Sequence, residues 1–313
     1  MIRFKELPID YTDTQAVISV MGAKSLGMGK TVAQLEEEFA SYIGSKYAVA
    51  FNSCTNALFL ALHQEEPTTV SIPSMMVALV ANEIIHTGHN IHFTDDCDWV
   101  GHSYHLLGTN IIDSAHEVEP LPKSVFDTHQ VCYSFYPTKP VCGADGGIIC
   151  TNDKDKAEWY KKARFFGRDN GDSIAKNSWE YGFEFAGWKM NMSDIQAAIV
   201  LNRLRQYPGT MAKMIEIREK YNTILGKNNS SNYLYRIDVQ QRDDFIDYMK
   251  TAGIECGVHF YPLHMVDMYK KYGQDSMVSV EGRYSTTVSL PFHIFLSDRE
   301  IEYICDKVEG WCK

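Results

Sequence analysis

The residue whose surroundings best suit covalent chemistry is Lys139, in the segment "VCYSFYPTKPVCGADGG" at 131–147. It lies between a run of β-forming residues and a glycine-rich turn, where the backbone is constrained. Shielding from water favours the neutral amine of a lysine, which is a nucleophile that can form a Schiff base with a carbonyl group. A loop lysine taken alone is most often a solvated surface charge, so the neighbouring motifs must distinguish the two.

A second segment, "IIDSAHEVE" at 111–119, supplies a carboxylate at the end of a short apolar run. The carboxylate of Asp113 could keep the ring nitrogen of a bound pyridine protonated, which would make that ring a strong electron sink. The alternative is that Asp113 caps a helix that begins at Ser114, a common role for Asp after a strand. The two roles are compatible.

A third segment, "FNSCTNALFLAL" at 51–62, opens a helix with three small or hydroxyl-bearing residues, Ser53, Cys54 and Thr55. Free N–H groups and the helix dipole at such a start suit a phosphate. Ser134 could donate its hydroxyl to the same phosphate. Capping serines and threonines are common, so the ordered set of segments is more specific than any one of them.

Alternating β-rich runs and helical patterns predict the elements that position these groups. The β-rich runs occupy 47–51, 69–72, 91–94, 110–112, 131–136 and 147–151, and the helical patterns include 32–43, 56–62, 76–86 and 193–204. This order predicts an α/β fold with a mostly parallel sheet between helices. Ligands of such sheets bind beyond the carboxyl ends of the strands, so Ser53, Asp113 and Ser134 are the first site candidates.

Length and punctuation predict two domains. Pro208 and Gly209 interrupt the helical pattern that begins near 193. We expect a large domain at 1–207 and a smaller C-terminal α+β domain at 208–313.

Composition excludes several classes of protein. A net charge of -10 argues against binding to nucleic acids or to anionic membranes. We expect neither a signal peptide nor a membrane span, because no apolar run has the necessary length. The eight cysteines are scattered without a Cys-x-x-Cys pair, which predicts reduced thiols and a cytoplasmic location.

Two apparent motifs do not hold. The segment "GMGKT" at 27–31 looks like part of a phosphate-binding P-loop, but the first glycine of that motif would fall at Lys24. His86, His89 and His92 have a spacing that suggests a metal, yet they straddle a helix end and lack supporting carboxylates. We expect no metal site.

Together the motifs resemble the DegT-type nucleotide-sugar aminotransferases, a family that depends on pyridoxal 5'-phosphate. The resemblance covers nearly the whole chain, from 29–44 to "VHFYPLH" at 258–264, and the lysine segment and the helix "SDIQAAI" at 193–199 are its most distinctive parts. It implies fold type I, in which a large domain holds a mostly parallel, seven-stranded-type sheet and a smaller α+β domain follows.

The resemblance also implies a role for each candidate residue. Lys139 would hold pyridoxal phosphate as a Schiff base, with pyridoxamine phosphate as an intermediate, and Asp113 would pair with the pyridinium nitrogen. The remaining implied contacts are His116 near the ring, Ser53, Cys54, Thr55 and Ser134 at the phosphate, Lys189 at the partner subunit's phosphate, Val77 at the ring-stacking position, and His259 and His264 near the substrate entrance.

The chain departs from the family at several of these positions. Relatives usually stack an aromatic residue on the ring where this chain has Val77, and Cys54 replaces a common glycine. The stretch between Asp95 and Gly108 is shorter, as if a strand–helix unit had been removed. Lys189 could instead be a solvated interface lysine, and the two histidines could simply flank the turn at Pro262.

The implied reaction moves an amino group from an amino acid, by resemblance glutamate, to a keto group of a nucleotide-linked deoxysugar. The active sites would be shared within a homodimer. Related dehydratases carry histidine in place of the lysine, so Lys139 favours amino transfer. Two alternatives stay open: an aminotransferase for a cyclitol or another non-sugar ketone, and a non-catalytic cofactor-binding or regulatory protein.

Overall fold

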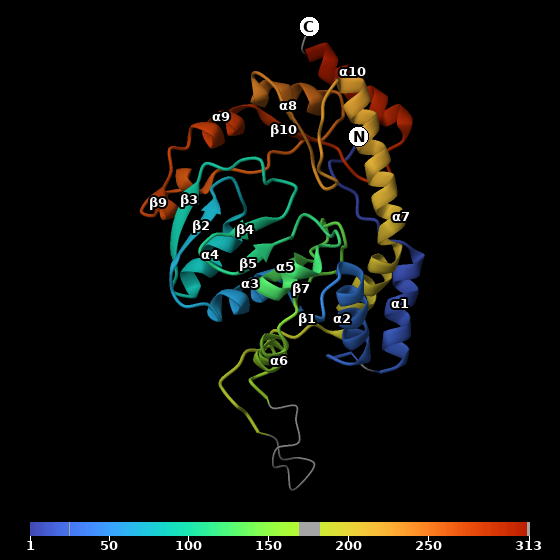
Figure 1. Cartoon of the computed structure of the whole chain (residues 1–313). Coiled ribbons are helices and arrows are strands. Elements are labelled where there is room, and N and C mark those ends of the chain that lie inside the picture. The colour runs from blue at the N-terminus through green and yellow to red at the C-terminus, as the bar shows by residue number, and fades with distance from the viewer. Residues whose placement is uncertain (25, 169–181, 312–313) are drawn as a thin grey trace. The chain divides into compact units, whose positions relative to one another are not determined.

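The computed structural model describes residues 1–24, 26–168 and 182–311 and divides into two compact units (Figure 1). The first, here called the Lys139 unit, comprises 10–67 and 109–205. The second, the Arg236 unit, comprises 1–9, 68–108 and 206–313. Among the described residues, no helix combines the length and the apolar composition needed to cross a bilayer.

The Lys139 unit is built on a mixed sheet in which four strands lie in the order β1-β7-β6-β5. Their bounds are β1 (Tyr47–Phe51), β5 (Ile111–Asp113), β6 (Gln130–Ser134) and β7 (Gly147–Thr151). β7 runs antiparallel to both β1 and β6, whereas β5 and β6 are parallel. The strands β1, β5 and β6 therefore share a direction, and their carboxyl ends meet the start of β7 at one edge of the sheet.

Helices of the Lys139 unit include those that the sequence predicts at 32–43, 56–62 and 193–204. They are α1 (Tyr11–Gly22), α2 (Lys30–Ile43), α3 (Cys54–His63), α5 (Lys123–Thr128), α6 (Lys154–Ala163) and the beginning of α7 (Asp194–Leu225). On α2 the predicted apolar positions Val32, Leu35 and Phe39 are buried. The helix ends at Gly44, whose φ of 93° is left-handed and therefore favours glycine.

The Arg236 unit contains a parallel sheet in the order β2-β3-β9 and an antiparallel pair β8-β10. The strands are β2 (Thr69–Pro73), β3 (Asn90–Thr94), β4 (Tyr104–Leu106), β8 (Tyr235–Asp238), β9 (Gly273–Gln274) and β10 (Thr287–Leu290). Its helices are α4 (Ala78–His86), α8 (Arg242–Thr251), α9 (Val278–Thr286), α10 (Asp298–Trp311) and the end of α7, with short 3-10 turns at Leu263–Met265 and Asp267–Tyr269.

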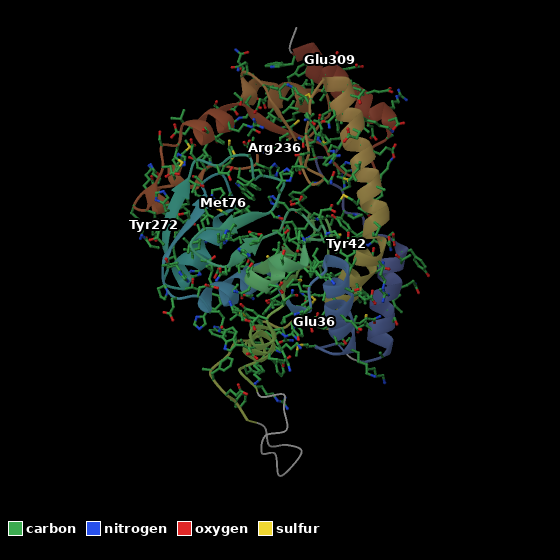
Figure 2. The ribbon with its side chains drawn as sticks, in the orientation of Figure 1. Glu36, Tyr42, Met76, Arg236, Tyr272 and Glu309 are labelled. Atoms are coloured by element: carbon green, nitrogen blue, oxygen red, sulfur yellow. The ribbon has the colours of Figure 1, made fainter. Side chains whose placement is uncertain are left out.

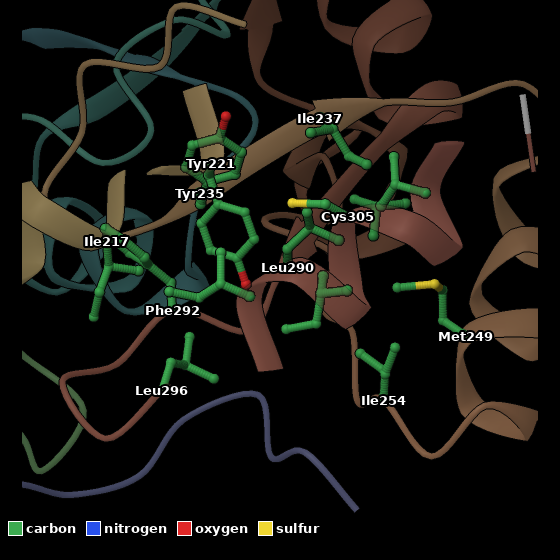
Figure 3. Close-up of a cluster of buried hydrophobic side chains, with 14 of the residues drawn as sticks. Ile217, Tyr221, Tyr235, Ile237, Met249, Ile254, Leu290, Phe292, Leu296 and Cys305 are labelled. Atoms are coloured by element: carbon green, nitrogen blue, oxygen red, sulfur yellow. The ribbon is translucent and has the colours of Figure 1, made fainter. Parts of the chain in front are cut away.

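The core of the Arg236 unit gathers side chains from these elements, as Figure 3 shows. The rings of Tyr221, on α7, and Tyr235, on β8, lie 4.7 Å apart between centroids, and Phe292 packs beside them. The Tyr221 hydroxyl donates to the Pro291 carbonyl at 3.0 Å, so this buried polar atom is satisfied.

The predicted interruption at Pro208 and Gly209 is wrong, because α7 continues through both residues as one helix of 32 residues. A proline inside a helix removes one backbone hydrogen bond and costs about 3 kcal/mol. Burial on both sides of the proline, at Leu204 and Tyr207 and again at Ile217, offsets that cost. The division into domains at 1–207 and 208–313 stays a prediction.

Candidate active site

Strand register brings the predicted site residues of the Lys139 unit to one edge of its sheet. Asp113, the last residue of β5, lies opposite Cys132 of β6. Ser134, the last residue of β6, lies opposite Gly147 of β7, and Gly147 also pairs with Phe51 at the end of β1. The carboxylate, the serine hydroxyl and the turn after β1 are thus neighbours although the chain separates them widely.

The turn after β1 leaves backbone donors available at the start of α3. Ser53 is the N-cap, and its Oγ accepts the N–H of Asn56 at 3.2 Å, while its carbonyl accepts the N–H of Ala57. Within the described part of the chain, the N–H groups of Cys54 and Thr55 have no hydrogen-bond partner. Two adjacent free N–H groups at a helix start, beside hydroxyls, form a suitable anion site.

Gly147 allows this helix start to lie directly on the sheet. A Cβ atom at Gly147 would lie 2.5 Å from the Cys54 nitrogen and closer still to its Cα. No side chain fits there, so the position of this helix start depends on a glycine in the neighbouring strand.

Asp113 is buried at 5% exposure, and its Oδ1 accepts the N–H of Ala115 at 2.9 Å. The capping role left open by the sequence is therefore present. Burial raises the pKa of the Cys54 thiol well above its usual range, the negative charge of Asp113 raises it further, and the charge of Lys139 lowers it. Both charged groups must lie near Cys54 to act on it in this way.

Lys139 is held in a loop between β6 and β7 that backbone hydrogen bonds close. Its own N–H donates to the Tyr136 carbonyl at 2.9 Å. Phe135 donates to Gly146 at 2.9 Å and receives the N–H of Gly143 at 2.8 Å. The lysine is half-buried.

Two further groups, His116 and Asp145, belong to the segments that carry Asp113 and Lys139. His116 is buried three residues after Asp113, in a turn that the hydroxyl of Ser114 closes by donating to the Glu117 carbonyl at 2.7 Å. The sequence analysis predicted no role for Asp145, but the negative charge of this residue also raises the pKa of the Cys54 thiol. Its place inside the lysine segment was the only signal that could have pointed to it.

Lys189 is exposed and lies beside the phosphate turn of its own chain. The carbonyl of Met190, the next residue, accepts the N–H of Asn52 at 2.9 Å. The Lys189 Nζ donates to Asn191 Oδ1 at 2.6 Å and lies 4.6 Å from the ring centroid of Phe165. These contacts orient a cation that is otherwise open to solvent.

Histidines of the segment 258–264 lie in the Arg236 unit and already have protein partners. His259 Nδ1 is 2.9 Å from Ser289 Oγ, and its ring stacks on Phe4 at 5.3 Å between centroids. His264 is buried, with Nδ1 2.6 Å from Ser74 Oγ and Nε2 3.2 Å from a Glu281 carboxylate oxygen. These contacts fix the turn around Pro262, and a role toward substrate stays a prediction.

Val77 also lies in the Arg236 unit, as the residue before α4, and is 42% exposed. Its predicted position against the cofactor ring stays a prediction.

The distinctive helix "SDIQAAI" has a structural role at its aspartate. Asp194 is buried, and its Oδ1 accepts the N–H groups of Gly29 at 2.9 Å and Val32 at 3.0 Å. The carboxylate thus occupies the start of α2, the place where a P-loop would hold a phosphate. The rejection of a P-loop at 27–31 agrees with this arrangement.

The sequence profile of the DegT/DnrJ/EryC1/StrS aminotransferase family matches residues 8–99 and 125–309. The chain is 28% identical to the spore coat polysaccharide biosynthesis protein SpsC of Bacillus subtilis, over 96% of the chain and 94% of that protein. It is 25% identical to the UDP-4-amino-4,6-dideoxy-N-acetyl-beta-L-altrosamine transaminase of Helicobacter pylori, over 97% of the chain and 96% of that protein.

Solved structures share the fold. That of Helicobacter pylori PseC, an aminotransferase involved in the biosynthesis of pseudoaminic acid, aligns with a TM-score of 0.86 at 23% identity over 98% of both chains. The fold is therefore that of the fold-type-I aminotransferases. The chain belongs to the DegT/DnrJ/EryC1/StrS aminotransferase family, and the resemblance inferred from its motifs is confirmed.

The family match leaves out residues 100–124, which include Asp113 and His116. The interruption overlaps the stretch from Asp95 to Gly108 that the sequence predicts to be shortened. The roles of Asp113 and His116 therefore depend on the motif and on the sheet register.

Proposed function

We propose that this aminotransferase binds pyridoxal 5'-phosphate through Lys139 and transfers an amino group from glutamate to a keto group of a nucleotide-linked deoxysugar. The observation that carries the proposal is the convergence of Lys139, Asp113 and the phosphate turn at one sheet edge within a single compact unit. The Helicobacter pylori relative, named as a UDP-linked amino-sugar transaminase, supports the substrate class.

Groups at this edge match the parts of a phosphorylated pyridine. The free N–H groups of Cys54 and Thr55, with the hydroxyls of Ser53 and Ser134, would hold the phosphate. Asp113 uses Oδ1 to cap Ala115, and a carboxylate has enough acceptor capacity to receive a pyridinium N–H as well. When bound, the cofactor would supply an electron sink for charge that develops on the amino donor.

Lys139 would act in two roles. Its Nζ would first hold the cofactor covalently. After the amino donor displaces it, the same Nζ would move the proton at the α-carbon of the donor. Backbone hydrogen bonds close the loop from Phe135 to Gly146 that carries this amine. His116 would lie beside the ring and limit its tilt.

We further propose a homodimer in which Lys189 contributes to the partner subunit's site. Lys189 is exposed, and the aromatic residues Phe166 and Phe183 in the same unit are 42% and 57% exposed. Exposed aromatic side chains near an oriented cation are typical of an interaction surface. Sedimentation equilibrium would detect the dimer, and a monomer at micromolar concentration would contradict it.

The proposed cytoplasmic location is supported by the thiols. All seven cysteines in the described part of the chain are free, and the eighth, Cys312, lies outside it. Free thiols are typical of reducing compartments.

Absorbance spectroscopy tests the proposed cofactor chemistry. Purified protein with added pyridoxal phosphate should show a band near the edge of the visible range, and glutamate should shift it to shorter wavelength. Lys139→Ala should abolish the band. Lys154→Ala is the matched control, because Lys154 is an exposed lysine of α6 and its loss should leave the spectrum unchanged.

The substrate is tested separately once the glutamate shift is seen. After treatment with glutamate, the protein carries the aminated cofactor. Addition of a UDP-linked 4-keto-6-deoxysugar should restore the starting spectrum, and addition of a nucleotide-free cyclitol ketone should not. Recovery with the cyclitol alone would replace the proposed substrate. No lysine-dependent band in the wild type would favour the non-catalytic alternative.

A further inference from the structure

A polar cavity of about 350 Å³ lies wholly within the Arg236 unit, apart from every residue assigned to the cofactor. Three segments form it: the loop between β3 and β4, the loop after α7, and the adjoining parts of β8 and α9. Its lining consists of Asp98, Val100, His102, Lys227, Asn228, Asn229, Ser230, Ser231, Arg236, Ile237, Asp238 and Arg283. Arg236 is labelled in Figure 2.

Direct hydrogen bonds between the two loops fix the walls of this cavity. The Ser231 hydroxyl donates to the Gly101 carbonyl at 3.1 Å and accepts the N–H of Tyr233 at 3.1 Å. Gly101 has a φ of 102°, and a Cβ atom there would lie 2.8 Å from the Ser231 Cβ, so the loops interlock at a glycine. His102 Nε2 lies 3.2 Å from Ser230 Oγ. A ligand would therefore meet a preformed site.

Two guanidinium groups at the cavity have few partners of their own. Among the described residues, the hydrogen-bond partner of both terminal nitrogens of Arg236 is the Cys97 carbonyl, at 3.4 Å each. Arg283 pairs with Asp238 at 3.0 Å, while its Nε is buried without a hydrogen-bond partner among the described residues. Burial first, and then the positive charge of Arg283, lower the pKa of Arg236 to about 10, although the charges of Asp238 and Asp98 act in the opposite direction. The two like charges are thus close enough to repel.

We propose that this cavity binds the phosphate group of a small molecule between Arg236 and Arg283. An oxyanion there would relieve the repulsion of the two arginines and offer acceptors to their unused N–H groups. Three cationic side chains, those of Lys227, Arg236 and Arg283, line the cavity beside two carboxylates, of which Asp238 is already paired. The excess of one positive charge favours an anion, and the many N–H donors suit the several oxygens of a phosphate.

The volume and the position of the cavity limit the class of ligand that it can bind. Its volume falls in the usual range for small-molecule sites and exceeds that of a bare phosphate, so the phosphate would carry an organic group. Val100 and His102 lie in the stretch 100–124 that the family profile does not match. Arg236 and Arg283 lie within the matched part of the chain, and the site is independent of the proposed amino transfer.

Calorimetric titration with inorganic phosphate tests the proposal, first on protein saturated with pyridoxal phosphate and then without it. On the saturated protein one phosphate per chain should bind, because the cofactor fills its own phosphate site; without pyridoxal phosphate, the start of α3 is also open to phosphate and a second phosphate per chain should bind. Arg236→Gln and Arg283→Gln should each raise the dissociation constant for phosphate at least tenfold. Arg299→Gln removes an exposed arginine of the same unit and should change it less than twofold.

Further variants separate ligand contact from folding. Arg236→Lys keeps the charge but loses the planar fork, so it should retain the wild-type circular dichroism spectrum and still bind phosphate several times more weakly. A sugar 1-phosphate and UDP, titrated in the same way, identify the source of the phosphate, and tighter binding of either than of inorganic phosphate supports the site.

Three results would overturn the proposal. The first is no phosphate binding at millimolar concentration by the wild type. The second is binding that pyridoxal phosphate abolishes, which would place the phosphate in the cofactor site. The third is binding of glutamate in place of phosphate with the same dependence on Arg236.

Discussion

The contact between Gly147 and the start of α3 makes Gly147→Ala a demanding test of the phosphate turn. The added methyl carbon would lie 2.5 Å from the Cys54 nitrogen, whereas carbon and nitrogen atoms in ordinary contact are about 3.5 Å apart. The first turn of α3 or the strand β7 must therefore move by about 1 Å. Either movement displaces the N–H groups proposed to hold the cofactor phosphate.

That movement should lower both the folding stability and the affinity for the cofactor. Overpacking of a close backbone contact costs about 1–3 kcal/mol of folding free energy. A lost hydrogen bond to a charged group costs about 1.5–3 kcal/mol, which corresponds to cofactor binding that is weaker by about 10- to 100-fold. We expect both effects in the variant, and the larger one in cofactor affinity.

Two assays measure these effects independently. Urea unfolding gives the free energy of unfolding, and titration with pyridoxal phosphate, followed by absorbance, gives the dissociation constant. The matched control is Gly209→Ala, because an added Cβ atom at Gly209, inside α7, has no neighbour within 4 Å. This control should raise the stability by about 0.5–1 kcal/mol and leave the cofactor dissociation constant unchanged.

An unchanged dissociation constant in Gly147→Ala would refute the assignment of the phosphate to the start of α3. A stable variant with weak cofactor binding would show that the helix start moves without loss of packing, and the phosphate assignment would remain.

Other predictions concern the carboxylates and a buried thiol. Asp113→Asn should keep the cap on Ala115, since the amide oxygen can accept the same N–H, but it should lower kcat/KM by at least about 100-fold with a near-native unfolding curve; equal kcat/KM would exclude a charged role. Asp13→Ala leaves the buried Arg203 without its nearest carboxylate, at 2.8 Å, and should cost about 3–5 kcal/mol in urea unfolding, whereas a loss below about 1 kcal/mol would contradict a desolvated pair. Burial raises the pKa of Cys142 from 9.0 to about 11, so the unfolded chain releases this proton first and stability should fall as pH rises from about 9 to 11. Cys142→Ala should flatten that pH dependence, and parallel profiles for variant and wild type would count against the thiol.

Local patterns in the sequence were sufficient to locate six strands and four helices of the fold. The strands expected at 47–51 and 147–151 have those bounds in the structure, and the helix expected at 32–43 begins only two residues earlier. Strand alternation, helical spacing and glycine stops are properties of neighbouring residues, so they are visible without any tertiary contact. The lysine motif was recognised for the same reason.

Contacts between residues far apart in the chain could not be predicted from the sequence. The continuation of α7 through Pro208 depends on burial of residues on both sides, which local propensity does not report. Asp194 caps α2 although the two are far apart in the chain, and no sequence pattern near Gly29 predicts this contact.

The sequence by itself determined the class of fold, the family and the candidate lysine, because the residue types in short segments are sufficient to identify each of them. Only the tertiary structure decided that Asp113, Ser134 and the helix start at Cys54 share one edge, because strand order and register set which residues become neighbours. It also decided that Arg236 and Arg283, one on a strand and one on a helix, meet at a cavity. Packing alone sets the distance between two such charges, and that distance determines whether they bind an anion.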